Sequence, residues 1–328
     1  MIAETAPLVQ SLGFDGFGLD IMRLDLIHPV TGGNKVFKLR HHLGAALAGN
    51  KCVLTFGGAN SNHIAAVAQA CSEKGLDCIG VVRGADMPTT TTIGLARTLG
   101  MKILPVSKDQ YSRRHDPDFI SDLNERFGDF YLIPEGGAGA EGVHGCSEIL
   151  PQRMAYDYVI CAAGTGTTVA GLVLSHGSVS HIIGVSALKG GNSVKNEVNG
   201  WLERLGCGHT VCGDESLATA ELRSHCILDS YAFSGFAKFD EEPESFRRWF
   251  EARTGILLDH IYNSKSFYAA FHLYETGRIP RGSRVLMVHT GGLQGNADFR
   301  QRYARKFDDT TGAITSRFFA GGRQTDYL

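Results

Sequence analysis

The stretch "KCVLTFGGANSNHIAAVAQACSEKGLDCIGVVRG", residues 51–84, contains the pattern that decides the fold. A short apolar run ends in glycines, a helical pattern follows, and a second short apolar run again ends in glycine. Apolar runs of about four to six residues that alternate with helices indicate βαβ units, whose strands are parallel. The stretch therefore predicts an α/β protein built on parallel sheet.

Similar apolar runs recur along the chain, and most of them end in glycine. They are "MKILPVS" (101–107), "DYVICAAGTG" (157–166), "HIIGVSALKGG" (181–191) and "RVLMVHTGG" (284–292). Open parallel sheets bind ligands in the crevice at the carboxyl ends of their strands, where such turns lie. The sequence shows no internal repeat and no flexible linker, so a second domain would be inserted within the first. We expect the glycine-rich turns to face one cleft.

The charge of the chain favours a small-molecule partner. Its 328 residues carry 32 Lys and Arg against 34 Asp and Glu, a formal net charge of -2. This balance provides no basic surface for nucleic acid or an anionic membrane, and we expect neither as a partner.

The cysteines and the N-terminus indicate a reducing compartment. Several of the eight cysteines lie in apolar runs, and no two have the C-x-x-C spacing of a zinc or redox site; they are Cys52, Cys71, Cys78, Cys146, Cys161, Cys207, Cys212 and Cys226. The first residues, "MIAETAPLVQSLGF", lack the basic and apolar regions of a signal peptide. No run reaches the ~18 apolar residues of a membrane span. We expect a cytoplasmic protein without a bound metal.

The turn "AAGTGTTVAG", residues 162–171, follows a predicted strand and opens a predicted helix. Free backbone N–H groups, the positive end of the helix dipole and glycines together make an anion site, to which threonine hydroxyls can add hydrogen bonds. The turn lacks the lysine of a P-loop and the full spacing of a dinucleotide fingerprint. It therefore predicts a phosphate site, and the alternative is a tight turn without a ligand.

Two further turns have the same strand, turn and helix pattern. In "GGANSNHIAAV", residues 57–67, Ser61 or Asn62 could simply cap the helix. "HTGGLQG", residues 289–295, could be a plain loop.

Lys35 lies in the stretch "HPVTGGNKVFKLRHHL", residues 28–43. A lysine reacts with aldehydes when its amine is desolvated, and a Schiff base to pyridoxal phosphate is a common use of such a lysine. That cofactor also needs a separate phosphate cup, which the "GTGTT" turn would supply. Lys35 and this turn together predict a pyridoxal-phosphate site, and the alternative for Lys35 is a solvated surface lysine.

Six motifs, in this order along nearly the whole chain, resemble the D-cysteine desulfhydrase and 1-aminocyclopropane-1-carboxylate deaminase family. They are "DLIHPVTGGNKVFKL", "GGANSNHIAAVA", "IPEGG", "GTGTTVAG", "TGILLDHIYNSKS" and "HTGGLQGN". The family consists of pyridoxal-phosphate enzymes with the tryptophan synthase β-subunit fold. The resemblance implies two open twisted, mostly parallel sheets flanked by helices, with the cofactor in the cleft between them. It implies a larger domain of residues 1–40 and 150–328 and a smaller inserted domain of residues 41–149.

The resemblance implies a role for each matching residue. Lys35 matches the lysine that carries the cofactor as a Schiff base and then moves protons. Asn62 matches the asparagine that hydrogen-bonds the 3'-oxygen of the cofactor. Ser61, Asn62 and His63 match the turn that receives the substrate carboxylate, and Ser61 is also a candidate for proton transfer.

The remaining matches surround the cofactor. The phosphate cup matches Gly164, Thr165, Gly166, Thr167 and Thr168. Tyr262 matches an active-site tyrosine near the substrate, and Thr290 matches a residue that faces the pyridine nitrogen.

Three positions depart from the deaminases of the family. Asn263 in "DHIYNS" replaces a glutamate near the pyridine nitrogen, Thr290 replaces a leucine, and Phe236 in "SGFAK" replaces a tyrosine. A carboxylate beside the pyridine nitrogen keeps the ring protonated, whereas a hydroxyl or amide leaves it largely neutral. A neutral ring suits β-elimination, in which a good leaving group departs once the α-proton is lost.

We therefore expect a pyridoxal-phosphate-dependent lyase with a small amino-acid substrate, for which D-cysteine is the best guess. The products would be pyruvate, ammonia and hydrogen sulfide. Two alternatives are a 1-aminocyclopropane-1-carboxylate deaminase and a pyridoxal-phosphate-binding protein with weak catalysis. The resemblance also suggests a homodimer.

Overall fold

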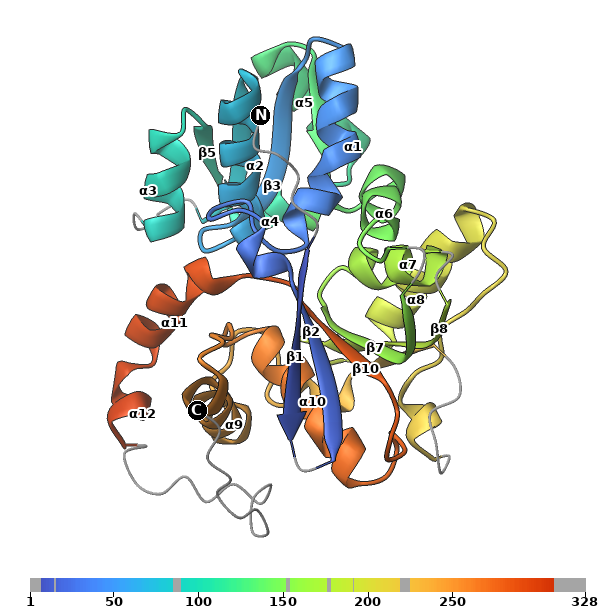
Figure 1. The fold of residues 1–328 in the computed structure, drawn as a ribbon. Coiled ribbons are helices and arrows are strands. Elements are labelled where there is room, and N and C mark those ends of the chain that lie inside the picture. Colours follow the sequence, from blue (N-terminus) through green and yellow to red (C-terminus); the bar gives the residue numbers. More distant parts are fainter. Residues whose placement is uncertain are drawn as a thin grey trace.

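The computed structural model contains two sheets, each with helices packed against it (Figure 1). It describes residues 7–14, 16–84, 90–151, 154–175, 178–190, 192–218 and 225–309. The two ends of the predicted larger domain, residues 1–6 and 310–328, lie outside this description.

The first sheet has six strands in the order β1-β2-β10-β7-β8-β9. All neighbouring strands are parallel except β1 and β2, which form an antiparallel hairpin. The strands are β1 (Leu8–Phe14), β2 (Phe17–Arg23), β7 (Ala155–Ala163), β8 (Ser178–Ser186), β9 (Cys226–Leu228) and β10 (Val285–His289).

The second sheet has four parallel strands in the order β5-β4-β3-β6. They are β3 (Cys52–Gly58), β4 (Cys78–Arg83), β5 (Lys102–Val106) and β6 (Phe130–Ile133). The prediction of an α/β protein with two mostly parallel sheets is confirmed. The boundaries proposed for the two domains stay a prediction.

Helices cover both sheets (Figure 1). Those along residues 35–127 are α1 (Lys35–Ala48), α2 (Asn62–Lys74), α3 (Thr91–Thr98), α4 (Lys108–Ser112) and α5 (Pro117–Phe127). The later ones are α6 (Ala140–Ser147), α7 (Thr167–Leu174), α8 (Ser193–Arg204), α9 (Glu241–Thr254), α10 (Asn263–Glu275), α11 (Asn296–Arg302) and α12 (Ala304–Asp309). Short 3-10 turns are η1 (Leu24–Leu26), η2 (Glu135–Gly137), η3 (Asp214–Ala218), η4 (Ser230–Ala232) and η5 (Leu293–Gly295).

Apolar side chains on both faces of each sheet form the core. Along β7, Tyr158 and Ile160 join one buried cluster, whereas Val159 and Cys161 join another. Successive residues of a strand point to opposite faces, so this alternation shows that β7 is buried on both sides. Such burial explains why the strands appear in the sequence as continuous apolar runs. None of the helices in the described ranges is long and apolar enough to cross a membrane.

Helix α6 packs closely between α1 and α7 because glycines remove side chains from both contacts. A Cβ atom on Gly145 would lie 1.9 Å from the carbonyl oxygen of Phe37 in α1. A Cβ atom on Gly171 of α7 would lie 2.3 Å from the Cβ of Cys146. This packing joins the helix that begins at Lys35 to the helix that begins at Thr167.

We predict that Gly145→Ala and Gly171→Ala each destabilise the protein, because either methyl group forces neighbouring backbone apart. Overpacking of this kind costs about 1–3 kcal/mol. Gly44→Ala is the matched control, since Gly44 lies in α1 and a Cβ atom there would have no neighbour within 4 Å. It should be neutral or stabilise by about 0.5–1 kcal/mol. Midpoints of urea unfolding are the measurement, and equal midpoints for Gly44→Ala and Gly171→Ala would contradict the packing argument.

Candidate active site

Two glycine turns meet backbone to backbone and thereby place Lys35. Gly33 has φ +81, and a Cβ atom there would lie 2.0 Å from the carbonyl oxygen of Thr290. The N–H of Asn34 donates to that same oxygen at 3.2 Å, and the N–H of Gly33 donates to Leu24 O at 2.8 Å. Only glycine allows both this approach and this φ. The first residue of α1 is therefore fixed beside the end of β10.

Lys35 is partly buried, and its ammonium group loses a proton more readily than that of an exposed lysine. Burial lowers its pKa well below the ordinary range of a lysine, and the neighbouring charge of Lys38 lowers it further, while Cys146 acts weakly in the opposite sense. Burial also lowers the pKa of Lys38, whose side chain is 4% exposed. Two buried cations destabilise each other, so more of the Lys35 amine is neutral and nucleophilic near neutral pH.

A cup of hydroxyl and N–H groups lies at the end of β7. Gly166 precedes α7 with φ +75, and a Cβ atom there would lie 2.7 Å from a methyl carbon of Val198. The hydroxyl groups of Thr165 and Thr167 lie 2.9 Å apart. The Asn34 amide donates to Thr168 Oγ1 at 2.9 Å. The close backbone and the N-terminal N–H groups of α7 are suited to bind an anion, and the phosphate site remains a prediction.

Lys38 adds a positive charge to this cup. Its Nζ donates to Thr165 Oγ1 at 3.4 Å. A buried ammonium beside a helix N-terminus is costly unless an anion compensates it. The arrangement therefore fits a phosphate group.

The turn that contains Ser61 both caps α2 and borders the cleft. Ser61 Oγ accepts the N–H of His63 at 3.3 Å, so the capping alternative holds for this serine. Asn62 Nδ2 donates to Gly292 O at 3.4 Å. Asn62 Oδ1 is buried and has no hydrogen-bond partner among the described residues. An amide with an unsatisfied buried atom in a cleft fits a polar ligand.

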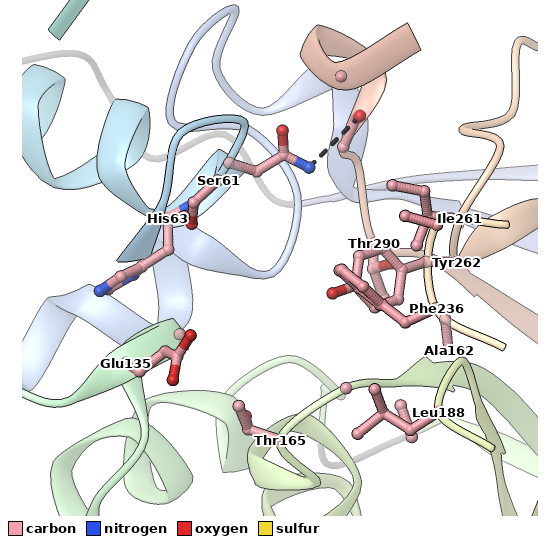
Figure 2. A pocket seen from close by; sticks show the side chains of 18 of the residues that line it. Ser61, His63, Glu135, Ala162, Thr165, Leu188, Phe236, Ile261, Tyr262 and Thr290 are labelled. Carbon is pink, nitrogen blue, oxygen red and sulfur yellow. Dashed lines mark hydrogen bonds between the residues drawn. The ribbon is translucent and has the colours of Figure 1, made fainter. Parts of the chain in front are cut away.

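The ring of His63 points away from Tyr262 and Thr290 (Figure 2). Its Nε2 lies 2.8 Å from Thr55 Oγ1, and that hydroxyl donates to Ile133 O at 2.8 Å. Thr55 therefore accepts from His63, which fixes the proton on Nε2. Burial, followed by the charge of Lys35, lowers the pKa of His63 well below its ordinary value. The His63 side chain is therefore neutral, and its ring contacts Thr55 of β3. Only the backbone N–H of His63 takes part in the turn that contains Ser61.

A buried network holds Thr290 at the end of β10. The Nδ2 of Asn263 donates to Asp259 Oδ1 at 2.6 Å and to Gly291 O at 2.8 Å. These two acceptors fix the orientation of the amide, so Asn263 Oδ1 accepts the N–H of Thr290 at 3.0 Å and its hydroxyl at 3.2 Å. Every polar group of the Asn263 side chain is thus engaged. Asn263 therefore holds both the backbone and the side chain of Thr290, a residue that lines the cleft.

Tyr262 forms another side of the cleft. Its ring lies 5.9 Å from that of Phe236 in an edge-on contact. A Cβ atom on Gly164 would lie 3.2 Å from the Tyr262 ring, so the glycine keeps this space open. Burial, followed by the charges of Asp259 and Glu135, raises the pKa of Tyr262. The phenol therefore keeps its proton and can donate it in a hydrogen bond.

One cleft of about 1160 Å³ collects these groups (Figure 2). Of the residues predicted for the site, its lining includes Lys35, Ser61, Asn62, His63, Gly164, Thr165, Gly166, Thr168, Tyr262 and Thr290. Thr167 is fully buried and does not line it, although its hydroxyl contacts Thr165.

Sequence reasoning missed three residues of the cleft. Lys38 and Asn34 flank Lys35, and the spacing of Lys38 puts it on the same helix face as Lys35. That spacing was a usable signal. Glu135 accepts from the Tyr111 hydroxyl at 2.8 Å and pairs with Arg114 at 2.9 Å. Glu135 lies in the motif "IPEGG", but its contacts with Tyr111 and Arg114 form only in the folded chain.

Comparison with known proteins identifies the family. The model described as "Pyridoxal-phosphate dependent enzyme" matches residues 3–291. A Pyrococcus horikoshii protein, provisionally named 1-aminocyclopropane-1-carboxylate deaminase, is 29% identical over 291 residues, 85% of this chain and 86% of that protein. A 1-aminocyclopropane-1-carboxylate deaminase of Bradyrhizobium sp. is 28% identical over 287 residues, 80% of this chain and 82% of its own. The solved structure of an ACC deaminase homologue has a TM-score of 0.75 and 26% identity, and covers 94% of this chain and 95% of its own.

These matches confirm the resemblance inferred from the six motifs. The geometry fits the cofactor as well, because a lysine of lowered pKa, a glycine cup beside the buried Lys38 and an unsatisfied asparagine oxygen line the same cleft. Lys35 would hold the aldehyde carbon, and the α7 turn with Lys38 would hold the phosphate. The chain belongs to the family of pyridoxal-phosphate-dependent enzymes.

Proposed function

We propose that this enzyme is a lyase that removes the β-substituent of a small amino acid by α,β-elimination. The observation that carries the proposal is the pairing of Thr290 with Asn263 at the end of β10. Neither side chain carries the negative charge with which a carboxylate would keep the pyridine nitrogen protonated. D-cysteine is the reference substrate, and its products are pyruvate, ammonia and hydrogen sulfide.

Lys35 is the proposed general base. The bound cofactor supplies an electron-accepting ring that makes the α-hydrogen of the substrate acidic. Lys35 Nζ would accept the proton from the α-carbon of the substrate. Its lowered pKa favours the neutral amine, which is the form that accepts a proton.

The Ser61 turn is the proposed site for the substrate carboxylate. The residues that begin α2 line the cleft, and the helix dipole favours an anion at this end. Ser61 Oγ already accepts from His63, so its own proton is available for a carboxylate oxygen. Tyr262 lies on the opposite side of the cleft from Ser61 (Figure 2), where it would border the substrate.

Two alternatives have their own support. The names of the relatives favour a 1-aminocyclopropane-1-carboxylate deaminase, whereas Asn263, Thr290 and Phe236 oppose ring opening. The second alternative is a protein that binds pyridoxal phosphate and has only weak catalytic activity. We also propose that the enzyme is a cytoplasmic homodimer, which rests on the resemblance and on the cysteine pattern.

The first prediction concerns the attachment site. Borohydride reduction of the enzyme with its cofactor, followed by peptide mapping, should place the pyridoxyl label on Lys35. Lys38→Met removes a neighbouring positive charge, so the pKa of Lys35 should rise and the pH for half-maximal labelling of the apo protein should move upward. Cofactor affinity should also fall, because the phosphate loses a cation. Lys74→Met, an exposed lysine of α2, is the control. A label on Lys38 in the unmodified enzyme would refute the assignment.

The second prediction concerns the reaction. Purified enzyme is assayed with D-cysteine, L-cysteine, D-serine and aminocyclopropane carboxylate, and pyruvate and 2-oxobutyrate are followed separately. We expect pyruvate from a β-substituted amino acid to form faster than 2-oxobutyrate from the cyclopropane. The reverse order would establish the deaminase alternative. Cofactor binding without turnover of any β-substituted amino acid would favour the weakly catalytic protein.

A further inference from the structure

The loop that follows η4 carries Phe236 in a conformation that polypeptide chains rarely adopt. Phe233 and Ala237 have φ +53 and +52, and Gly235 between them has φ +111. Non-glycine residues at positive φ store strain and persist only where surrounding structure enforces them. Backbone strain is common at binding sites, so the contacts that hold this loop can indicate such a site.

A buried lysine holds the loop. Lys265 is 1% exposed, and its Nζ donates to Ala232 O at 2.7 Å and to Gly235 O at 2.9 Å. On the far side, the hydroxyl of Tyr303 donates to Ala237 O at 3.0 Å. Three hydrogen bonds to main-chain oxygens thus fix the backbone on both sides of Phe236.

The held loop presents an apolar surface to the cleft. Phe236 is 47% exposed and Leu188 is 36% exposed, although both are large apolar side chains. Both line the cleft, and Figure 2 shows them on the same side as Tyr262. We call Leu188, Phe236 and Tyr262 the apolar wall. Exposed apolar side chains gathered in a cleft mark a surface that a ligand covers.

The opposite side of the cleft carries an ion pair between Glu135 and Arg114. Glu135 is held by the Tyr111 hydroxyl and by Arg114, at 2.8 and 2.9 Å. A charged side chain on the substrate would have to compete with this ion pair. An apolar side chain would gain the uncovered surface of the apolar wall without breaking any contact.

We propose that this site selects amino acids with an apolar β-substituent, such as an alkyl or aryl thioether, over free cysteine. The inference rests on the proposed function and specifies its substrate class. In the reaction the α-proton passes to Lys35, the Cβ–S bond breaks, and the thiolate leaves with the bonding electrons. With one water consumed, the products are a thiol, pyruvate and ammonia. The thiol carries the apolar group away.

The test separates binding from turnover. The change in the visible absorption of the bound cofactor is titrated with alanine, 2-aminobutyrate, norvaline and norleucine, in both enantiomers, none of which has a leaving group. Full burial of one methylene is worth about a fourfold change in affinity. We expect the dissociation constant to fall roughly two- to fourfold per methylene, and kcat/KM to be higher for S-ethylcysteine than for cysteine.

Matched variants assign the effect to the apolar wall. Phe236→Ala and Leu188→Ala should flatten the dependence on chain length, whereas Leu47→Ala, a similarly exposed leucine of α1, should leave it intact. A flat series in the unmodified enzyme, with a clear absorption change, would overturn this inference and leave the proposed function standing. No absorption change with any amino acid would overturn both. A Phe236→Ala enzyme that loses cofactor affinity but keeps the series would show that the wall serves the cofactor instead.

Discussion

The close contact of Gly33 with the backbone of Thr290 and Gly291 is the constraint on which the site depends. It joins the loop after β2 to the loop after β10, two strands that are neighbours in the first sheet. Because the contact is made by backbone atoms, it leaves no freedom for a side chain to adjust. Lys35 follows two residues later, so the contact also fixes the backbone of Lys35 at the start of α1. The first sheet, rather than a flexible loop, thus sets the position of this lysine.

Charge balance gives the second constraint. Lys35 and Lys38 lie in the same buried region, and α7 directs its positive end at the same place. Burial lowers the pKa of both lysines, and the charge of Lys38 lowers that of Lys35 further, so a positive charge here is unfavourable without an anion. A phosphate group next to Lys38 would relieve this cost. The same arrangement would then serve both proposed roles, binding of the cofactor by Lys38 and proton transfer by Lys35.

Strands and glycine turns, which depend on local sequence pattern, were predicted from the sequence. Contacts between residues far apart in the chain were not. Runs such as "VLTFGG" and "VICAAG" revealed buried parallel strands, and "GGNK" with "GTGTT" indicated the lysine and the phosphate turn. The β1–β2 hairpin was not predicted, because β1 has no buried residue and an irregular pattern, although β2 is largely buried. Asn263 is separated from Thr290 by 27 positions, so its role as a support for the hydroxyl emerged only in the fold. The direction of the His63 ring depends on Thr55, which no motif identifies.

The loop anchored by Lys265 has an evolutionary consequence. Its fixing hydrogen bonds come from α10 and from Tyr303, and none of them involves Lys35, Ser61 or Thr290. These bonds hold the backbone of the loop without using the Phe236 side chain, which reaches the active site through its ring contact with Tyr262. A change of side chain at position 236 can therefore reshape the cleft wall while the backbone keeps its path, provided that the lysine anchor remains. A lineage of such enzymes can thus acquire new substrates while it keeps its chemistry.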